Sequence, residues 1–261
     1  MPAERIEPRF VERVWGSFQL APWFPNPAAK IGEVWFPAGR LLIKFLFTTE
    51  ALSVQVHPDD DYARRHHSSA GKTEMWYVLA AQPGARIAAG FAQPVTREQV
   101  RGAALDGSIE ELLGWHAARA GDTYLTRAGV VHALGAGLVV CEIQQTSDIT
   151  YRLYDYARQP ARELHLDQGL KVAELGPHPG AATPLPLSGG GARLAACEYF
   201  VTELWTSAAA RQWDRDSVII VLSGKGSVDN QPFSRGEVWQ APGGTIVNPD
   251  GEAVLLRTYE P

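Results

Sequence analysis

Short runs of apolar residues, separated by glycine, proline and aspartate, recur along most of the chain. Clear examples are Leu41–Phe47, Leu138–Ile143 and Ser217–Leu222. Apolar runs of this length, bounded by turn-forming residues, are typical of buried β-strands. The pattern therefore predicts a mainly β protein.

The clearest helical pattern lies between Thr96 and Trp115. Within it, Ile109–Leu113 has apolar residues three and four positions apart, as on one face of a helix. Thr96 and Gln99 have the spacing of a capping box, so we expect a helix to begin there. The polar stretch Tyr62–Ser69 is expected to form an exposed loop.

A segment rich in proline and glycine divides the chain and ends in the triplet Gly189–Gly191. This composition is typical of a linker. We therefore expect two domains and a connection, over residues 1–176, 193–261 and 177–192 respectively. The helical pattern would form an insertion at about 85–120 of the first domain.

The two sides of this linker share a spacing of turn residues. A glycine, a turn residue, a second glycine and a fourth position recur at equal intervals, namely Gly121, Arg127, Gly129 and His132, then Gly236, Pro242, Gly244 and Val247. The Gly-x5-Pro-x-Gly spacing resembles the second signature of the cupin β-barrels, in which a sharp turn presents a ligand. A repeated β-unit favours two jelly-roll barrels; the alternative is a chance echo between two turn-rich β regions.

The same comparison separates the roles of the two barrels. Val247 stands where His132 stands, and Ser217 stands where Glu74 stands. We therefore expect the second barrel to be structural and to bind no metal.

Composition and charge narrow the class of protein. The 261 residues carry a formal charge of −5, which gives no reason to expect nucleic acid as a partner. The two cysteines, Cys141 and Cys197, lie far apart and suggest no disulfide framework. Neither a signal-peptide pattern nor an apolar run of about 20 residues is present, so no membrane association is expected. A cytoplasmic location is the expectation.

Four side chains have the chemistry and placement of metal ligands. Gln55 and His57 are two residues apart, so on a strand both point to the same face. Glu74 opens the next apolar run, which would return beside that strand, and His132 follows the cupin-like turn. Two imidazoles and two oxygens suit zinc, without excluding iron, manganese, cobalt or nickel. Each residue alone also has a structural reading as a hydrogen-bonded strand residue.

Long, ordered segments of the chain resemble the type I phosphomannose isomerases, a family of cupins, in their short bacterial form. The segments are Leu52–Asp60, Gly71–Leu79, Ala128–Ala133 and Glu142–Asp155, with weaker matches at Val14–Gly16, Ile31–Trp35 and Cys197–Phe200. The resemblance implies a zinc-dependent enzyme that interconverts mannose 6-phosphate and fructose 6-phosphate. It also implies one zinc ion held by Gln55, His57, Glu74 and His132, an active-site arginine at Arg152, and a basic group beside the metal at Lys72.

Such a reaction moves a proton between C1 and C2 through a cis-enediol. It needs a base, a cation near the oxygens and a site for the phosphate. Arg152 is a permanent cation with a planar fork, and Lys72 would share the strand face of Glu74. Glu142 is the candidate base, and Lys72 and a metal-bound water are the alternatives. Residues expected to bind the substrate are Ser53, Lys72, Lys44 and Glu33.

Structural explanations exist for the same residues. Glu142 could pair with Lys44 or Arg152 inside a sheet, and Arg152 could form a surface ion pair with Asp148 or Asp155. The chain also departs from the family pattern at Arg127, which occupies the usual proline of the turn before His132. The helical domain of longer family members is missing, so the resemblance implies least about lid and specificity contacts.

Two other functions use the same residues. One is an Fe(II) cupin oxygenase, and the other is a sugar-phosphate-binding cupin without catalysis. Lys72 and Arg152 are cations of the type that bind phosphate, which favours a hexose 6-phosphate as the partner. The sequence does not fix the oligomeric state, and a monomer is compatible with it.

Overall fold

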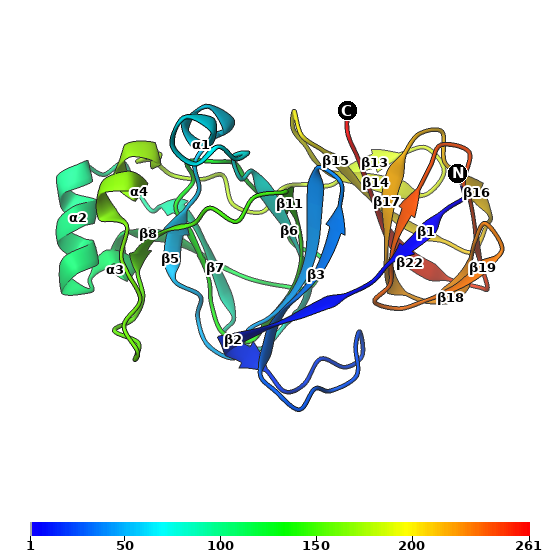
Figure 1. Ribbon diagram of the computed structural model, residues 1–261, viewed down its shortest axis with the longest axis horizontal. Coiled ribbons are helices and arrows are strands. Elements are labelled where there is room, and N and C mark those ends of the chain that lie inside the picture. Colours follow the sequence, from blue (N-terminus) through cyan, green and yellow to red (C-terminus); the bar gives the residue numbers. More distant parts are fainter. Residues whose placement is uncertain (1) are drawn as a thin grey trace.

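The computed structural model describes residues 2–261. Over these residues, four antiparallel β-sheets stack face to face in two sandwiches, with helices at one end (Figure 1). Along the long axis, the layers are the helices, then sheets of five, six, seven and four strands. This arrangement confirms the prediction of a mainly β protein with two jelly-roll barrels and a short helical part in the first.

The first sandwich consists of the six-stranded and the five-stranded sheet. In spatial order, the six-stranded sheet is β2 (Arg9–Ser17), β3 (Ile31–Ala38), β4 (Leu41–Phe47), β11 (Leu138–Gln145), β6 (Glu74–Ala81) and β9 (Thr123–Thr126). The five-stranded sheet is β12 (Tyr151–Tyr154), β5 (Val54–Val56), β10 (His132–Leu134), β7 (Arg86–Phe91) and β8 (Leu113–Ala117). Some neighbours, such as β4 and β11 or β5 and β12, lie far apart in sequence, as expected for a jelly roll.

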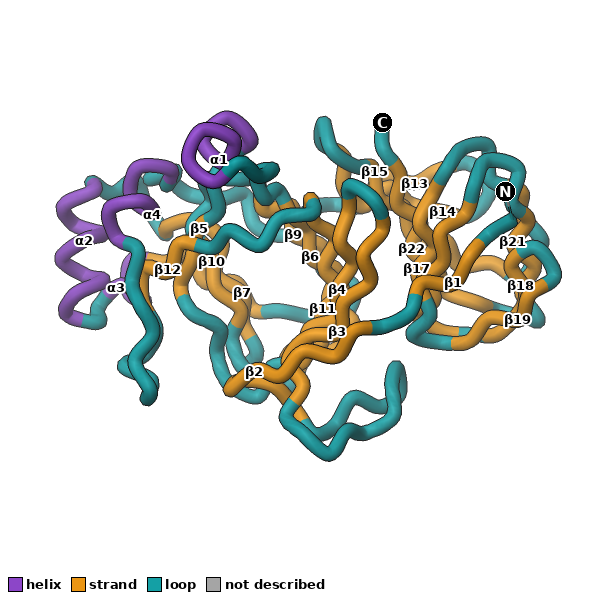
Figure 2. Tube along the Cα trace, viewed as in Figure 1, coloured by secondary structure: helices purple, strands orange, loops and turns teal. Residues whose placement is uncertain are grey.

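The second sandwich consists of the seven-stranded and the four-stranded sheet (Figure 2). The seven-stranded sheet is β1 (Glu4–Ile6), β20 (Val238–Ala241), β17 (Ser217–Ser223), β22 (Ala253–Tyr259), β15 (Val201–Ser207), β14 (Gly191–Ala196) and β13 (Leu185–Leu187). The four-stranded sheet is β16 (Arg211–Gln212), β21 (Ile246–Pro249), β18 (Lys225–Val228) and β19 (Gln231–Ser234). Strands β1 and β13 thus join this sandwich from outside the range 193–261.

Helices cover the outer face of the five-stranded sheet. They are α2 (Arg97–Asp106), α3 (Ile109–Leu112) and α4 (Leu166–Val172). The predicted start of α2 is confirmed, because the Thr96 side chain accepts from the Gln99 N–H and the Gln99 side chain accepts from the Thr96 N–H. Strands β7 and β8 flank α2 and α3, so the helices themselves occupy only the middle of residues 85–120.

The expected loop at Tyr62–Ser69 is instead mostly helix α1 (Asp60–His67). Asp59 caps it by accepting from the Tyr62 N–H (2.7 Å). Acidic residues lie in the first turn and basic ones in the last, which complements the helix dipole. These local signals outweigh the lack of an apolar stripe that motivated the loop prediction.

The two sandwiches share an apolar interface. The outer face of the six-stranded sheet contributes Val34, Phe36 and Phe45, and the seven-stranded sheet contributes Ile220 and Leu256, among other fully buried side chains. Strand β4 is therefore buried on both faces, which explains why Leu41–Phe47 is apolar throughout. Among residues 2–261, no helix is long and apolar enough to cross a membrane.

The strand registers relate the two sandwiches residue by residue. Glu74 pairs with Thr126, five residues after Gly121, and Ser217 pairs with Ala241, five residues after Gly236. Both glycines have positive φ, 95° and 85°, as do Gly129 and Gly244 at the second turn, 92° and 96°. The correspondence extends to His132 opposite Gln55 and Val247 opposite Arg211. The repeat read from the sequence is therefore a structural repeat.

Candidate metal centre

The four predicted ligands meet at one end of the first sandwich, where its two sheets face each other. Gln55 lies in β5, His57 directly follows it, and His132 begins β10; these strands belong to the five-stranded sheet. Glu74 begins β6 in the six-stranded sheet. Because His132 pairs with Gln55, their side chains share the inward face. The site therefore bridges the two sheets.

Two nitrogen–oxygen distances at this site are close to those between the ligands of a tetrahedral ion, each to a different oxygen of Glu74. His132 Nε2 lies 3.3 Å from Glu74 Oε1, and His57 Nε2 lies 3.6 Å from Glu74 Oε2. Metal bonds of about 2.0–2.1 Å place tetrahedral ligand atoms about 3.3–3.4 Å apart. One ligand atom from each of these three residues lies within 4.8 Å of the others, and all three are buried. The three side chains therefore form a candidate metal site.

Gln55 completes the set through its amide. Its Nε2 lies 3.3 Å from His132 Nε2, and Ser53 Oγ lies 3.4 Å from its Oε1. Turning the amide by 180° puts Oε1 toward the histidine and Nε2 toward the serine hydroxyl, which can accept. The orientation that suits a metal thus keeps a partner for both amide atoms.

Both histidines present Nε2 to the centre, because backbone carbonyls hold their other nitrogens. His57 Nδ1 donates to Ile149 O (2.8 Å), and His132 Nδ1 donates to Val130 O (2.9 Å). Burial lowers the pKa of His132 to about 4, and the Lys72 cation contributes in the same direction. Burial, again with Lys72, also lowers the pKa of His57 well below its ordinary value. Both imidazoles are therefore neutral at pH 7, as metal ligands must be.

The Glu74 carboxylate is fully buried, and its close cation is Lys72, whose Nζ lies 2.9 Å from Oε2. Among the described residues, no other donor forms a hydrogen bond with either oxygen. Burial raises the pKa of Glu74 to about 7 against the opposing Lys72 cation. A buried carboxyl group of this kind gains most from a cation at the centre. This observation supports metal binding independently of the distances.

Lys72 lies against two of the proposed ligands. Its Nζ is 3.1 Å from His57 Nε2, in addition to the contact with Glu74. Burial alone would lower its pKa, but the carboxylates of Glu74 and Glu142 raise it above the ordinary value. Lys72 therefore supplies a positive charge that balances these carboxylates.

A buried ion pair lies beside the centre in the six-stranded sheet. Lys44 Nζ is 3.1 Å from Glu142 Oε1, and Trp76 Nε1 donates to Glu142 Oε2 (2.9 Å). Burial alone would raise the pKa of Glu142, but the Lys44 and Lys72 cations and the indole lower it to about 2. The structure thus pairs Glu142 with Lys44, as one of the structural readings proposed, and keeps the carboxylate ionised.

Trp35 and Glu33 extend this cluster toward the surface. Lys44 Nζ lies 4.9 Å from the centre of the Trp35 ring, whose Nε1 donates to Glu33 Oε2 (3.0 Å). Arg13 Nη2 lies 2.7 Å from the same oxygen of Glu33. Glu33 is therefore already engaged by two donors.

Arg152 lies on the same row of the five-stranded sheet as the ligands. It pairs with Gln55 across β12 and β5, so its side chain shares the inward face. Its Nη1 donates to Glu163 O (2.9 Å), whereas its buried Nε has no hydrogen-bond partner within residues 2–261. Burial and the neighbouring cations Arg162 and Arg158 lower its pKa. A guanidinium in this state is suited to receive an anion.

The turn before His132 is closed despite Arg127. The Val130 N–H donates to Arg127 O (3.1 Å), and the Gly129 N–H donates to His57 O (2.9 Å). The Arg127 side chain points outward and pairs with Glu198 of the second sandwich (3.1 Å). The turn thus links His57, one proposed ligand, to the segment that carries His132, another proposed ligand.

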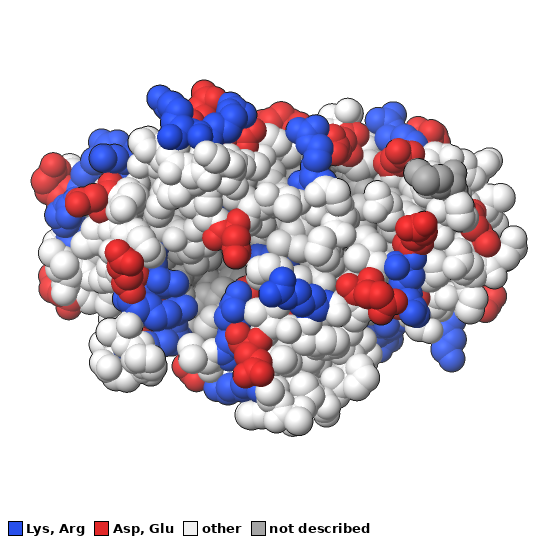
Figure 3. Space-filling view, viewed as in Figure 1, with Lys and Arg blue, Asp and Glu red and all other residues white. Residues whose placement is uncertain are grey.

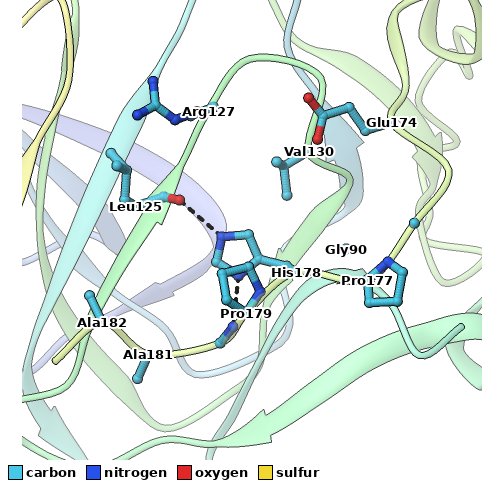
Figure 4. A pocket seen from close by; sticks show the side chains of 12 residues that line it. Gly90, Leu125, Arg127, Val130, Glu174, Pro177, His178, Pro179, Ala181 and Ala182 are labelled. Carbon is cyan, nitrogen blue, oxygen red and sulfur yellow. Dashed lines mark hydrogen bonds between the residues drawn. The ribbon is translucent and has the colours of Figure 1, made fainter.

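Two concave features lie near the site. Figure 3 shows a hollow on one face, over the space between β7 and β3, with charged side chains around its rim. A separate pocket of about 360 Å³ lies on the outer side of the His132 turn, between Leu125, Val130 and the segment 176–182 (Figure 4). None of the predicted site residues lines that pocket, so we do not assign the chemistry to it.

Trp76 is a site residue that the sequence prediction missed. It lies two residues after Glu74, so the alternation that placed Lys72 near Glu74 also points Trp76 to the centre. Its ring meets that of His132 edge-on, with centroids 5.1 Å apart. The alternation was present in the sequence, but a tryptophan in an apolar run is ordinarily interpreted as a core residue.

Relatives of known name match most of the chain, whereas no family model matched it. The Bacillus subtilis (strain 168) mannose-6-phosphate isomerase ManA is 32% identical, over 92% of this chain and 92% of the relative. A Streptococcus mutans mannose-6-phosphate isomerase is 36% identical over 72% of this chain, which spans 62% of that relative.

Solved structures agree on the fold. The crystal structure of the mannose 6-phosphate isomerase from Bacillus subtilis aligns with 99% of this chain and 100% of its own, with a TM-score of 0.86 and 24% identity. A zinc-bound mannose 6-phosphate isomerase aligns over both full lengths with a TM-score of 0.76 and 14% identity. Given the sequence relationship to the Bacillus subtilis enzyme, the chain belongs to the mannose-6-phosphate isomerase family.

Proposed function

We propose that the protein is a metal-dependent isomerase that interconverts mannose 6-phosphate and fructose 6-phosphate. The observation that carries this proposal is the buried carboxylate of Glu74 between His57 and His132, beside the ionised Glu142. The identity of the proposed substrate comes from the relatives, which are named mannose-6-phosphate isomerases.

Gln55, His57, Glu74 and His132 would hold one divalent ion, for which we propose zinc. The two neutral imidazoles and two oxygens suit zinc, and a related structure is described as zinc bound. Bound there, the ion would act as a Lewis acid that polarises the sugar carbonyl and holds the neighbouring hydroxyl.

The protein's own groups would move the proton and bind the charges. Glu142 would accept the C2 proton of the aldose and return it to C1, while a hydroxyl proton moves between O2 and O1. Lys72 and a metal-bound water are the alternative bases. Arg152 and Lys72 would hold the negative charge that develops on the enediol oxygens or that the phosphate carries. Ser53, Lys44 and Glu33 remain candidates for substrate binding. Lys44 also holds Glu142 in place, and Glu33 holds Trp35.

Turnover with and without metal tests the proposal. The purified protein should convert mannose 6-phosphate to fructose 6-phosphate, lose this activity on exhaustive chelation and regain it with zinc. Activity should be equal under anaerobic conditions, since no oxygen is consumed. Binding of the sugar phosphate by the zinc-loaded protein without turnover would favour a sensor, and oxygen-dependent turnover with Fe(II) would favour an oxygenase.

Two variants separate metal binding from chemistry. His132→Ala should lose bound metal and activity together, because it removes a ligand. Arg152→Ala should keep the metal but lose most turnover. Elemental analysis beside the isomerase assay distinguishes the two, and activity retained in both would contradict the site assignment.

We further propose a cytoplasmic location, with a hexose 6-phosphate as the small-molecule partner. Cys141 and Cys197 are both free, which is compatible with a reducing compartment.

A further inference from the structure

Trp76 contacts two different parts of the candidate site with one rigid side chain. It is 1% exposed and lies on the inward face of β6, in register with Glu142 of β11. Its Nε1–H donates to Glu142 Oε2 (2.9 Å), and its ring meets the His132 ring at 68° with centroids 5.1 Å apart. An indole has only two side-chain torsions, so both contacts are set together.

The hydrogen bond fixes the plane of the Glu142 carboxylate. Lys44 holds Oε1 from β4, and Trp76 holds Oε2 from β6, the strands on either side of β11. With a donor on each oxygen, the group cannot turn about its last bond without losing one of them. The carboxylate therefore has one orientation relative to the sheet.

The ring contact fixes the neighbouring imidazole. The Val130 carbonyl accepts a hydrogen bond from His132 Nδ1. Packing must therefore limit how far the imidazole ring turns about this hydrogen bond. Trp76 lies against one side of the ring, and the His57 ring lies 4.9 Å away on another. The direction of His132 Nε2, and hence the position of an ion, depends on this packing.

We propose that Trp76 is a positioning residue that fixes the distance and angle between the Glu142 carboxylate and the metal ligand His132. This inference rests on the proposed isomerase function, in which the carboxylate takes a proton from a sugar held at the metal. Small displacements at such a centre are costly, and one of about 1 Å can reduce a rate about 100-fold. Trp76 acts through Glu142 and His132 and need not touch the substrate.

The test is Trp76→Phe in the zinc-loaded enzyme. Phenylalanine keeps an aromatic ring beside His132 but has no N–H for Glu142. We expect kcat to fall about 10- to 100-fold, with KM and bound zinc within about twofold of wild type. The kinetic isotope effect with substrate deuterated at C2 should rise, because proton transfer alone is slowed. Trp76→His, which keeps an N–H at the same ring position, should recover part of kcat.

Trp205→Phe is the matched control. Trp205 Nε1 donates to Glu203 Oε2 over the same 2.9 Å, and both residues are buried in the second sandwich. This variant should lower the melting temperature as Trp76→Phe does, yet leave kcat and the isotope effect unchanged.

Three results would overturn the inference: unchanged kcat in Trp76→Phe, a loss of kcat that follows loss of zinc, or an equal loss in Trp205→Phe. A wild-type protein that does not isomerise mannose 6-phosphate would refute the proposed function itself, which the wild-type assay reveals before any variant is made.

Discussion

Lys44 and Glu142 form an ion pair from which water is almost excluded. Their side chains are only 5% and 6% exposed, and the pair lies on one row of the six-stranded sheet. Removing both charges from water is unfavourable, so such a pair adds little net stability over apolar residues of similar shape. Removing one charge is different, because the other is then buried alone.

We therefore expect Glu142→Gln to lower the free energy of unfolding by about 3–5 kcal/mol. The double variant Lys44→Met/Glu142→Leu should recover most of this loss, since neither charge remains. Urea unfolding of the three proteins measures the difference. A double variant as unstable as the single one would contradict the interpretation.

The same carboxylate predicts an acid dependence. The pKa of Glu142 is about 2 in the folded protein against an ordinary value of 4.5. Its contribution to stability is therefore complete above about pH 4.5 and is lost as the pH falls toward 2, where the folded state also takes up the proton. Between these values, stability should fall less steeply in Glu142→Gln than in wild type.

Single residues were predictable where strand alternation defines their direction. Gln55 and His57 are two apart, and the structure brings both to the centre with Glu74 and His132. The contact between Trp76 and Glu142 was not predictable in this way, because it depends on the register of β6 against β11. The catalytic and ligand roles of these residues stay predictions.

At the scale of elements, the two equivalent turns offer a comparison within one chain. Gly129 and Gly244 have φ of 92° and 96°. The Gly129 N–H donates to His57 O, directly after β5, and the Gly244 N–H donates to Trp213 O, directly after β16. A Cβ on Gly129 would lie 3.1 Å from Val172 O, whereas one on Gly244 would find its nearest neighbour, the Gln212 amide, at 4.0 Å.

Alanine at either glycine should lower the free energy of unfolding by about 1–2 kcal/mol, because positive φ strains any residue with a Cβ. Only Gly129→Ala should also weaken zinc binding, since its turn joins His57 to His132. Zinc titration against a competing chelator, beside thermal unfolding, checks both variants. Equal zinc affinity in the two would show that the turn does not position the ligands.

The elements themselves differ in how much the sequence specified them. Helix α2 was predictable because its capping box is local. The prediction of a loop at Tyr62–Ser69 was wrong because the helix there is stabilised by the Asp59 cap and its charge pattern rather than by an apolar stripe. Strand β1 was not predictable, because its partner β20 is more than 200 residues away.

Across the whole molecule, the shared apolar interface makes the two sandwiches depend on each other. The six- and seven-stranded sheets bury one face each against the other. We expect one cooperative unfolding transition, with equal calorimetric and van't Hoff enthalpies. Ile220→Ala, at the interface, should lower stability by about 2–5 kcal/mol without splitting the transition. Two resolved transitions would contradict this coupling.

The sequence predicted two barrels from the repeat but not how they pack. An apolar run such as Leu41–Phe47 indicates burial on both faces, yet it does not identify the partner of each face. For the outer face of β4, the partner is the seven-stranded sheet of the second sandwich. This contact exists only in the folded chain.

The repeat also bears on whether the protein stays folded without the proposed ion. In the second sandwich, Arg211, Trp213, Ser217 and Val247 occupy the positions of the four proposed ligands. The guanidinium of Arg257 reaches into that centre, donating to Ser217 Oγ (2.9 Å) and lying 4.6 Å from the Trp213 ring centre. This half therefore carries a tethered cation that no chelator can remove.

Small metal-dependent domains commonly unfold when the ion leaves. Here the second sandwich keeps the Arg257 cation whether or not an ion is present. Its seven-stranded sheet packs against the six-stranded sheet, which carries Glu74. We therefore expect the chain to remain folded after the proposed ion is removed.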